Sequence, residues 1–78
     1  MNVIERLNRV FREVLEDDAI VLAPSTTAAD IDGWDSLSHV QLVLAAEREF
    51  NVRLRASEIG GLENVGAFVE LLERKSAA

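Results

Sequence analysis

The stretch DIDGWDSLSHVQLV concentrates the side chains of this sequence that could do chemistry. Three aspartates stand close to Ser36, and His39 follows three residues later. A hydroxyl, an imidazole and carboxylates at this spacing suggest three kinds of site. These are a serine nucleophile with a histidine base, a metal-binding loop, and a serine that another enzyme modifies.

A self-contained hydrolase is the first possibility. His39 would take the proton of Ser36, and Asp32 or Asp35 would orient the imidazole. The sequence has no Gly-x-Ser-x-Gly turn and no evident oxyanion hole, and a domain of this size offers little cleft. His39 also falls in phase with apolar residues, where a structural histidine is the commoner case. We therefore reject the hydrolase and expect the protein to catalyse nothing by itself.

A calcium-binding loop is the second possibility, because Asp30, Asp32 and Gly33 match the opening of an EF-hand. The register then fails. The fifth position is Trp34, and the sixth, where the sharp turn needs glycine, is Asp35. We expect no metal site here.

The third possibility makes Ser36 a substrate. A hydroxyl in the first turn of a helix, beside Gly33 and flanked by acid, is accessible to the active site of another enzyme. A phosphate attached there would meet the positive end of the helix dipole, which contributes about 0.3–1 kcal/mol, although Asp35 would oppose it. The alternative is that Ser36 merely caps the helix.

Three long helices and one short helix must position this stretch. Apolar residues with helical spacing predict a first helix from Val3 to Leu15. A second helix should begin at Asp35 or Ser36 and run to about Phe50, followed by a short turn of helix near residues 57–59. Asn64 should cap the last helix. The fold class is therefore all-α, a small four-helix bundle with a long first loop.

The long loop between the first two helices contains Pro24, a Ser-Thr-Thr run and Gly33, which break helical periodicity. It also contains four aliphatic side chains that we expect to plug the core: Ile20, Val21, Leu22 and Ile31. A loop of this length in so small a domain is usually functional.

The second helix carries two apolar stripes. The stripe expected to face the core consists of Leu42, Val43, Ala46 and Phe50. The other stripe consists of Leu37, Val40 and Leu44, and we call it the docking stripe. One interpretation places it under the long loop, covered by Ile31 or Trp34. The other leaves it exposed, rimmed by Glu47, as a surface for a partner.

Size and composition limit the remaining classes. The chain has 78 residues, which we treat as one domain spanning 1–78, and no cysteine for disulfides or thiolate metal sites. Its net charge of −6 repels nucleic acid and anionic membranes and favours partners with basic surfaces. No apolar run has the length of a signal peptide or membrane span, so we expect a cytoplasmic monomer.

The segment DGWDSLSHVQLV resembles the 4′-phosphopantetheine attachment motif of acyl carrier proteins, in which Asp-Ser-Leu opens the second helix. The similarity continues through LAAEREFNVRL to ENVGAFVELL, and includes the spacing of Glu47 and Phe50 and the pair Asn64-Val65. It covers essentially the whole chain and implies an acyl-carrier-like bundle.

This resemblance implies that a phosphopantetheinyl transferase attaches the group to Ser36 from coenzyme A, and that Asp35 helps the transferase and its metal ion dock. Acyl groups would be held as thioesters on the arm. Acyl-loading, condensing and tailoring enzymes would contact the second helix at a partner interface made of Asp35, Leu37, Val40, Gln41, Leu44 and Glu47.

The sequence departs from housekeeping fatty-acid carriers at Gln41 and Arg48, where glutamates are common. Gly-Trp-Asp-Ser-Leu looks more like freestanding carriers of polyketide-type and related specialised pathways.

Two alternative functions stay open. An aminoacyl carrier is one, although peptidyl carriers usually show Gly-Gly before the motif and D-alanyl carriers a tryptophan where Leu62 and Glu63 stand. An unmodified helical docking module is the other.

Overall fold

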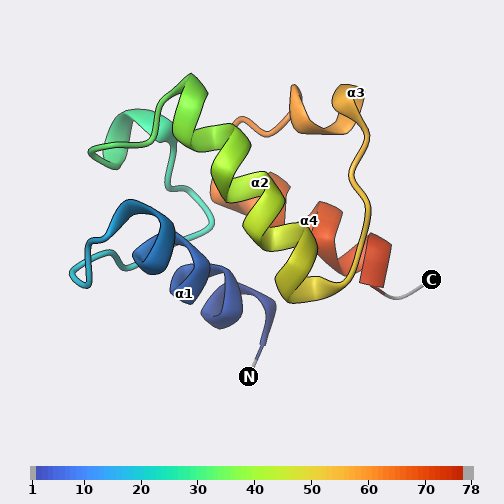
Figure 1. Cartoon of the computed structure of the whole chain (residues 1–78), viewed down its shortest axis with the longest axis horizontal. Helices are drawn as coiled ribbons and strands as arrows, with labels where there is room; N and C mark the ends of the chain where they lie inside the picture. The colour runs from blue at the N-terminus through green and yellow to red at the C-terminus, as the bar shows by residue number, and fades with distance from the viewer. Residues whose placement is uncertain (1, 77–78) are drawn as a thin grey trace.

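The computed structural model describes residues 2–76 and contains helices but no strand in that range. Helix α1 packs against both α2 and α4, and the short α3 lies on the connection from α2 to α4 (Figure 1). The predicted all-α class, with three long helices and one short one, is confirmed. The elements are α1 (Val3–Leu15), the 3-10 turn η1 (Ala28–Asp30), α2 (Ser36–Phe50), α3 (Ala56–Ile59) and α4 (Val65–Ser76).

The helix boundaries follow from local capping. Asn2 caps α1 by accepting the Glu5 N–H at 2.9 Å, and Asn64 caps α4 by accepting the Ala67 N–H at 2.8 Å. The helix α2 ends where Asn51 adopts a left-handed conformation with φ of 54°, which asparagine tolerates better than most residues. These boundaries agree with the sequence predictions.

Aromatic side chains from three segments meet in the core. Phe11 of α1 packs edge-on against Trp34 with ring centroids 4.9 Å apart, and against Phe68 of α4 at 6.3 Å. Burying one such side chain contributes about 1.5–3 kcal/mol, so a core this small depends on each one. The largest fully buried side chains are Phe11, Phe68, Leu7, Leu42, Leu72 and Val65.

The long first loop contributes to this core, but less than the sequence predicted. Ile20 and Leu22 are buried, and Ile31 is half-buried and packs against the core. Val21 is 75% exposed, so its predicted place in the core is wrong. The side chains on either side of Val21 both point inward, which leaves it facing solvent.

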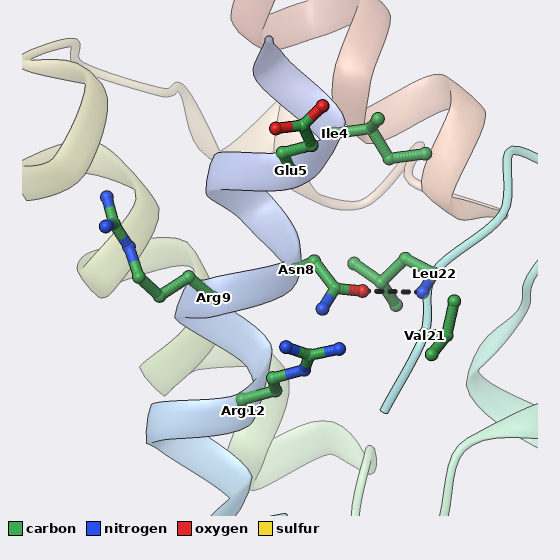
Figure 2. Close-up of a pocket in the computed structure, with 7 residues that line it drawn as sticks. All are labelled: Ile4, Glu5, Asn8, Arg9, Arg12, Val21 and Leu22. Carbon is green, nitrogen blue, oxygen red and sulfur yellow. Dashed lines mark hydrogen bonds between the residues drawn. The ribbon is translucent and has the colours of Figure 1, made fainter. Parts of the chain in front are cut away.

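Two side chains of α1 hold the loop in place (Figure 2). The Asn8 side chain accepts the Leu22 N–H at 2.6 Å and donates to the Ile20 carbonyl at 3.1 Å. Arg12 donates its Nε–H to the same carbonyl at 2.8 Å. These bonds satisfy backbone groups that have no helix or strand to pair with.

The later part of the loop is tied to the start of α4. The N–H of Val65 donates to the Thr26 carbonyl and that of Gly66 to the Pro24 carbonyl, both at 2.8 Å. A Cβ added at Gly66 would lie 3.0 Å from the Pro24 oxygen, so glycine permits this close approach. The loop thus supplies partners for N–H groups that a helix start leaves unsatisfied.

No helix within residues 2–76 is long and apolar enough to cross a membrane.

Asn8→Ala should lower the free energy of unfolding by about 1–3 kcal/mol, because it removes two hydrogen bonds and leaves the Leu22 N–H without its partner. Urea denaturation followed by circular dichroism measures the change. Gln41→Ala, at an exposed position of α2, is the control and should change stability by less than about 0.5 kcal/mol. An equally small effect of Asn8→Ala would contradict the anchoring role.

Candidate functional site

The start of α2 is fixed by reciprocal hydrogen bonds between Asp35 and Ser38. Asp35 Oδ1 accepts the N–H groups of Leu37 at 3.1 Å and of Ser38 at 2.9 Å. In return, Ser38 Oγ accepts the Asp35 N–H at 2.8 Å and donates its proton to the Gly33 carbonyl. This is a capping box with serine in the place usually taken by glutamate or glutamine.

Ser36 is the first residue of α2 and is exposed to solvent. Within residues 2–76 no side-chain hydrogen bond engages its hydroxyl, because Asp35 and Ser38 perform the capping. The alternative in which Ser36 serves as the cap is therefore wrong. The hydroxyl is available for chemistry with an external partner.

Gly33 sets the turn that leads into this site. Its φ is 88°, in the region that glycine adopts without strain. An added Cβ would meet nothing closer than 3.9 Å, so the requirement for glycine comes from the backbone angle. The turn presents the Gly33 carbonyl to Ser38 and directs Trp34 into the core.

His39 has a structural role, as its helical phase predicted. Its Nδ1 accepts the Trp34 Nε1–H at 3.0 Å, and its Nε2 lies 3.4 Å from the Ile59 carbonyl. Since the indole nitrogen is only a donor, this geometry assigns the ring proton to Nε2, which donates to Ile59. Both ring nitrogens are occupied by these partners, so His39 is not placed to act as a base for Ser36.

A shallow hollow of about 440 Å³ lies beside the Ser36 hydroxyl. Its lining combines small, aromatic and polar residues from η1 and the start of α2: Ala28, Trp34, Asp35, Ser36 and His39. The hollow places a partly apolar surface next to Ser36.

The docking stripe is exposed along the outer side of α2. The exposed fractions are 73% for Leu37, 54% for Val40 and 53% for Leu44. Trp34 is buried in the core and does not cover the stripe, so the interpretation in which the loop hides it is wrong. The predicted core stripe, in contrast, is buried: Leu42, Val43, Ala46 and Phe50.

The other residues expected at the partner interface differ in their surroundings. Asp35 and Gln41 are exposed, whereas Glu47 is half-buried. Glu47 Oε2 accepts the Leu54 N–H at 2.8 Å and so holds the segment after α2. The sequence prediction did not anticipate this structural contact.

The cap lowers the pKa of Asp35 below its ordinary value, chiefly because the Ser38 N–H donates to the ionised carboxylate. Burial opposes this with a smaller effect, and the Ser38 side chain and then the Leu37 N–H lower this pKa further. Hydrogen bonds to the charged form favour ionisation. The cap is therefore fully formed at neutral pH.

Sequence reasoning did not assign a role to Ser38, although a signal was present. A capping residue at Asp35 followed by a hydrogen-bonding side chain three positions later is the spacing of a capping box. The hydrogen bond from Trp34 to His39 had no comparable signal, since helical phase predicts the side on which a residue lies and not its partner.

Comparisons with known proteins identify the family of the chain. Residues 5–72 match the family model described as "Phosphopantetheine attachment site". The acyl carrier protein of Helicobacter pylori is 31% identical over 78 residues and covers 100% of both chains. The acyl carrier protein of Caulobacter vibrioides is 29% identical over 76 residues, 97% of each chain. The solution NMR structure of holo acyl carrier protein from Geobacter metallireducens has a TM-score of 0.91 and 40% identity, covering 99% of this chain and 88% of that one.

Replacing Asp35 by Asn should make stability less dependent on acid pH. The pKa of Asp35 is lower in the folded protein than in the unfolded protein. The ionised carboxylate therefore stabilises the fold at pH values above the unfolded pKa, and this contribution is lost as the pH falls through the folded pKa. We therefore expect the free energy of unfolding to fall less steeply in Asp35→Asn than in the wild type between about pH 5 and about pH 2. Asparagine still caps a helix, so the two proteins should be close in stability at low pH.

Urea titrations across this pH range measure the effect, with Asp18→Asn at an exposed turn as the control. Glu49 and Glu58 also have lowered pKa values, through hydrogen bonds from Arg6 and from the Arg55 backbone, so part of the acid dependence remains in every variant. Identical pH slopes for Asp35→Asn and the wild type would contradict the role given to the cap.

Proposed function

This chain belongs to the phosphopantetheine-attachment family of acyl carrier proteins, and on that basis we propose that Ser36 is the residue that carries the prosthetic group. The prosthetic group of the family is 4′-phosphopantetheine, and its members are non-catalytic carriers. When bound, the arm supplies a terminal thiol that holds acyl groups as thioesters. The observation that carries the proposal is the exposed Ser36 hydroxyl at the capped start of α2, which makes no side-chain hydrogen bond to any of the described residues 2–76.

Attachment to Ser36 requires an external enzyme. The Ser36 oxygen forms a bond to phosphorus of coenzyme A, the phosphorus–oxygen bond to the nucleotide part breaks, and the hydroxyl proton passes to a base. His39 is turned toward Trp34 and Ile59, so the base belongs to the phosphopantetheinyl transferase. The hollow beside Ser36 and the positive end of α2 fit an attached phosphate.

Asp35 has a second oxygen free for the transferase. Both capping N–H groups bind Oδ1, and within residues 2–76 no hydrogen bond engages Oδ2. The carboxylate is exposed and next to Ser36. It can therefore contribute to docking the transferase and its metal ion while it keeps the helix capped.

Partner enzymes contact the docking stripe, with Gln41 beside it. Three aliphatic side chains more than half exposed on one helix face form the kind of apolar surface that partners cover. Acyl-loading, condensing and tailoring enzymes are the partners.

The sequence Gly-Trp-Asp-Ser-Leu favours cargo of a polyketide-type or related specialised pathway over general fatty-acid synthesis. The net charge of −6 and the absence of cysteine support a cytoplasmic monomer.

Incubation with coenzyme A, magnesium and a broad-specificity transferase should add one phosphopantetheine unit to the wild type, as measured by intact mass. Ser36→Ala should gain nothing and keep its fold, since the lost hydroxyl makes no internal hydrogen bond among the described residues. Ser57→Ala, an exposed serine in the first turn of α3, is the matched control and should be loaded normally. Loading of Ser36→Ala would place the attachment elsewhere, and no loading of the wild type would favour the unmodified docking module.

Val40→Glu should reduce acyl transfer to a condensing enzyme roughly tenfold while loading by the transferase changes much less, because it places a charge in the centre of the docking stripe. Val21→Glu makes the same change at an exposed valine in the long loop and should leave both rates unchanged. Loading and transfer rates are measured on the same preparations. A large loss of thermal stability, or equal loss of both rates, would mean that Val40 acts in the fold.

A further inference from the structure

The docking stripe ends in a basic surface at the far end of α2. At about 100° per residue, Arg48 falls in line with Leu37 and Leu44, and it is exposed. A hollow of about 320 Å³ beside this end of the stripe is lined by Leu44, Glu47, Arg48, Asn51, Val52 and Arg53. The apolar stripe therefore continues directly into two arginines, of which Arg53 is also exposed.

The carboxylates next to Arg48 along α2 are engaged elsewhere. Glu47 accepts the Leu54 N–H at 2.8 Å. Glu49 is paired with Arg6 at 2.9 Å and with Arg9 at 3.4 Å. Within residues 2–76 no ion pair or side-chain hydrogen bond involves Arg48 or Arg53, so both charges are available to a partner.

The opposite end of α2 has the reverse sign. Asp35 caps the helix beside Ser36, and Asp30 and Asp32 are exposed just before it. Figure 1 shows α2 running from a green start to a yellow end. The helix of 15 residues spans about 22 Å, which is more than two Debye lengths at physiological salt, so each end acts on a partner separately.

We propose that the far end of the docking stripe, formed by Leu44, Arg48 and Arg53, binds a partner surface with an apolar contact flanked by carboxylates. This inference rests on the proposed function and specifies the chemistry of the partner: basic groups near Ser36 and acidic groups about 20 Å away. A partner that is basic along the whole length of its docking site is disfavoured, because its charges would meet Arg48 and Arg53.

Two synthetic helical peptides test this inference. Both carry leucines at positions i, i+3 and i+7, and the leucines are flanked by glutamates in one peptide and by lysines in the other. Titrated into the full chain labelled with nitrogen-15, without prior loading, the acidic peptide should shift the amide signals of Leu44, Arg48 and Arg53. It should bind roughly fivefold or more tightly than the basic peptide at about 150 mM salt, and the difference should shrink at about 500 mM.

The double variant Arg48→Glu with Arg53→Glu should lose or reverse this preference. Arg74→Glu is the matched control, because it changes an exposed arginine in the last turn of α4 and should keep the preference. Circular dichroism checks that each variant is folded, and the wild-type preference is informative by itself if the double variant does not fold. Equal affinity for both peptides, or a preference retained by the double variant, would overturn the inference.

Two further measurements distinguish binding of a partner from self-association of the chain, and failure of this inference from failure of the proposed function. Shifts of the same amides with protein concentration, without peptide, would show that a second copy of the chain covers this surface, which would also overturn the inference. Transferase loading of the same variants, measured by intact mass, should be normal because Ser36 lies at the other end of α2. A failure of loading in the wild type would count against Ser36 as the attachment site, and it would leave the peptide result to be judged separately.

Discussion

The capping box between Asp35 and Ser38 is the constraint on which the site depends. Asp35 must accept the first N–H groups of α2, and Ser38 must bond back to the Asp35 N–H and to the Gly33 carbonyl. Trp34 is buried immediately before this box and Ser38 is buried at its end. Two buried anchors four residues apart leave Ser36 and Leu37 outside, one with a free hydroxyl and the other with an exposed apolar side chain. The same bonds that begin the helix therefore expose both Ser36, the proposed attachment residue, and Leu37, the first residue of the docking stripe.

The loop before the site reaches this geometry without regular secondary structure over most of its length. Side chains of α1 take the place of a neighbouring strand, since Asn8 pairs with both Ile20 and Leu22. The backbone of α4 supplies the second attachment, through bonds to Pro24 and Thr26. Loops are usually the most variable part of a domain. Here the loop is held at two places before it reaches Gly33, and this support lets Trp34 enter the core at a defined position.

The sequence alone predicted the helix boundaries and helix faces, because these are determined by residues close together in the chain. Helix boundaries at Asp35 and Asn64 follow from side chains that cap their own helix, and the two stripes of α2 follow from helical phase. The errors and omissions concern contacts between distant residues. Val21 is as apolar as its neighbours, and only the placement of the loop by Asn8, more than ten residues earlier, decides that it faces solvent. Ser36 as the attachment residue remains a prediction from the resemblance, because geometry shows that its hydroxyl is accessible and not that it is modified.

The arrangement of α2 separates two tasks that a single helix must perform. Its inner side supplies the core with Leu42 and Phe50, so substitutions there change stability and function together. Its outer side contributes little to the core, and its two ends are stabilised by different contacts: the cap at Asp35, and the pairing of Glu47 with Leu54 at the other end. Substitutions near Arg48 should therefore leave the capped start of the helix, where Ser36 is exposed, undisturbed. In a domain with so small a core, this separation allows the outer surface of α2 to change while the core and the capped start of the helix stay the same.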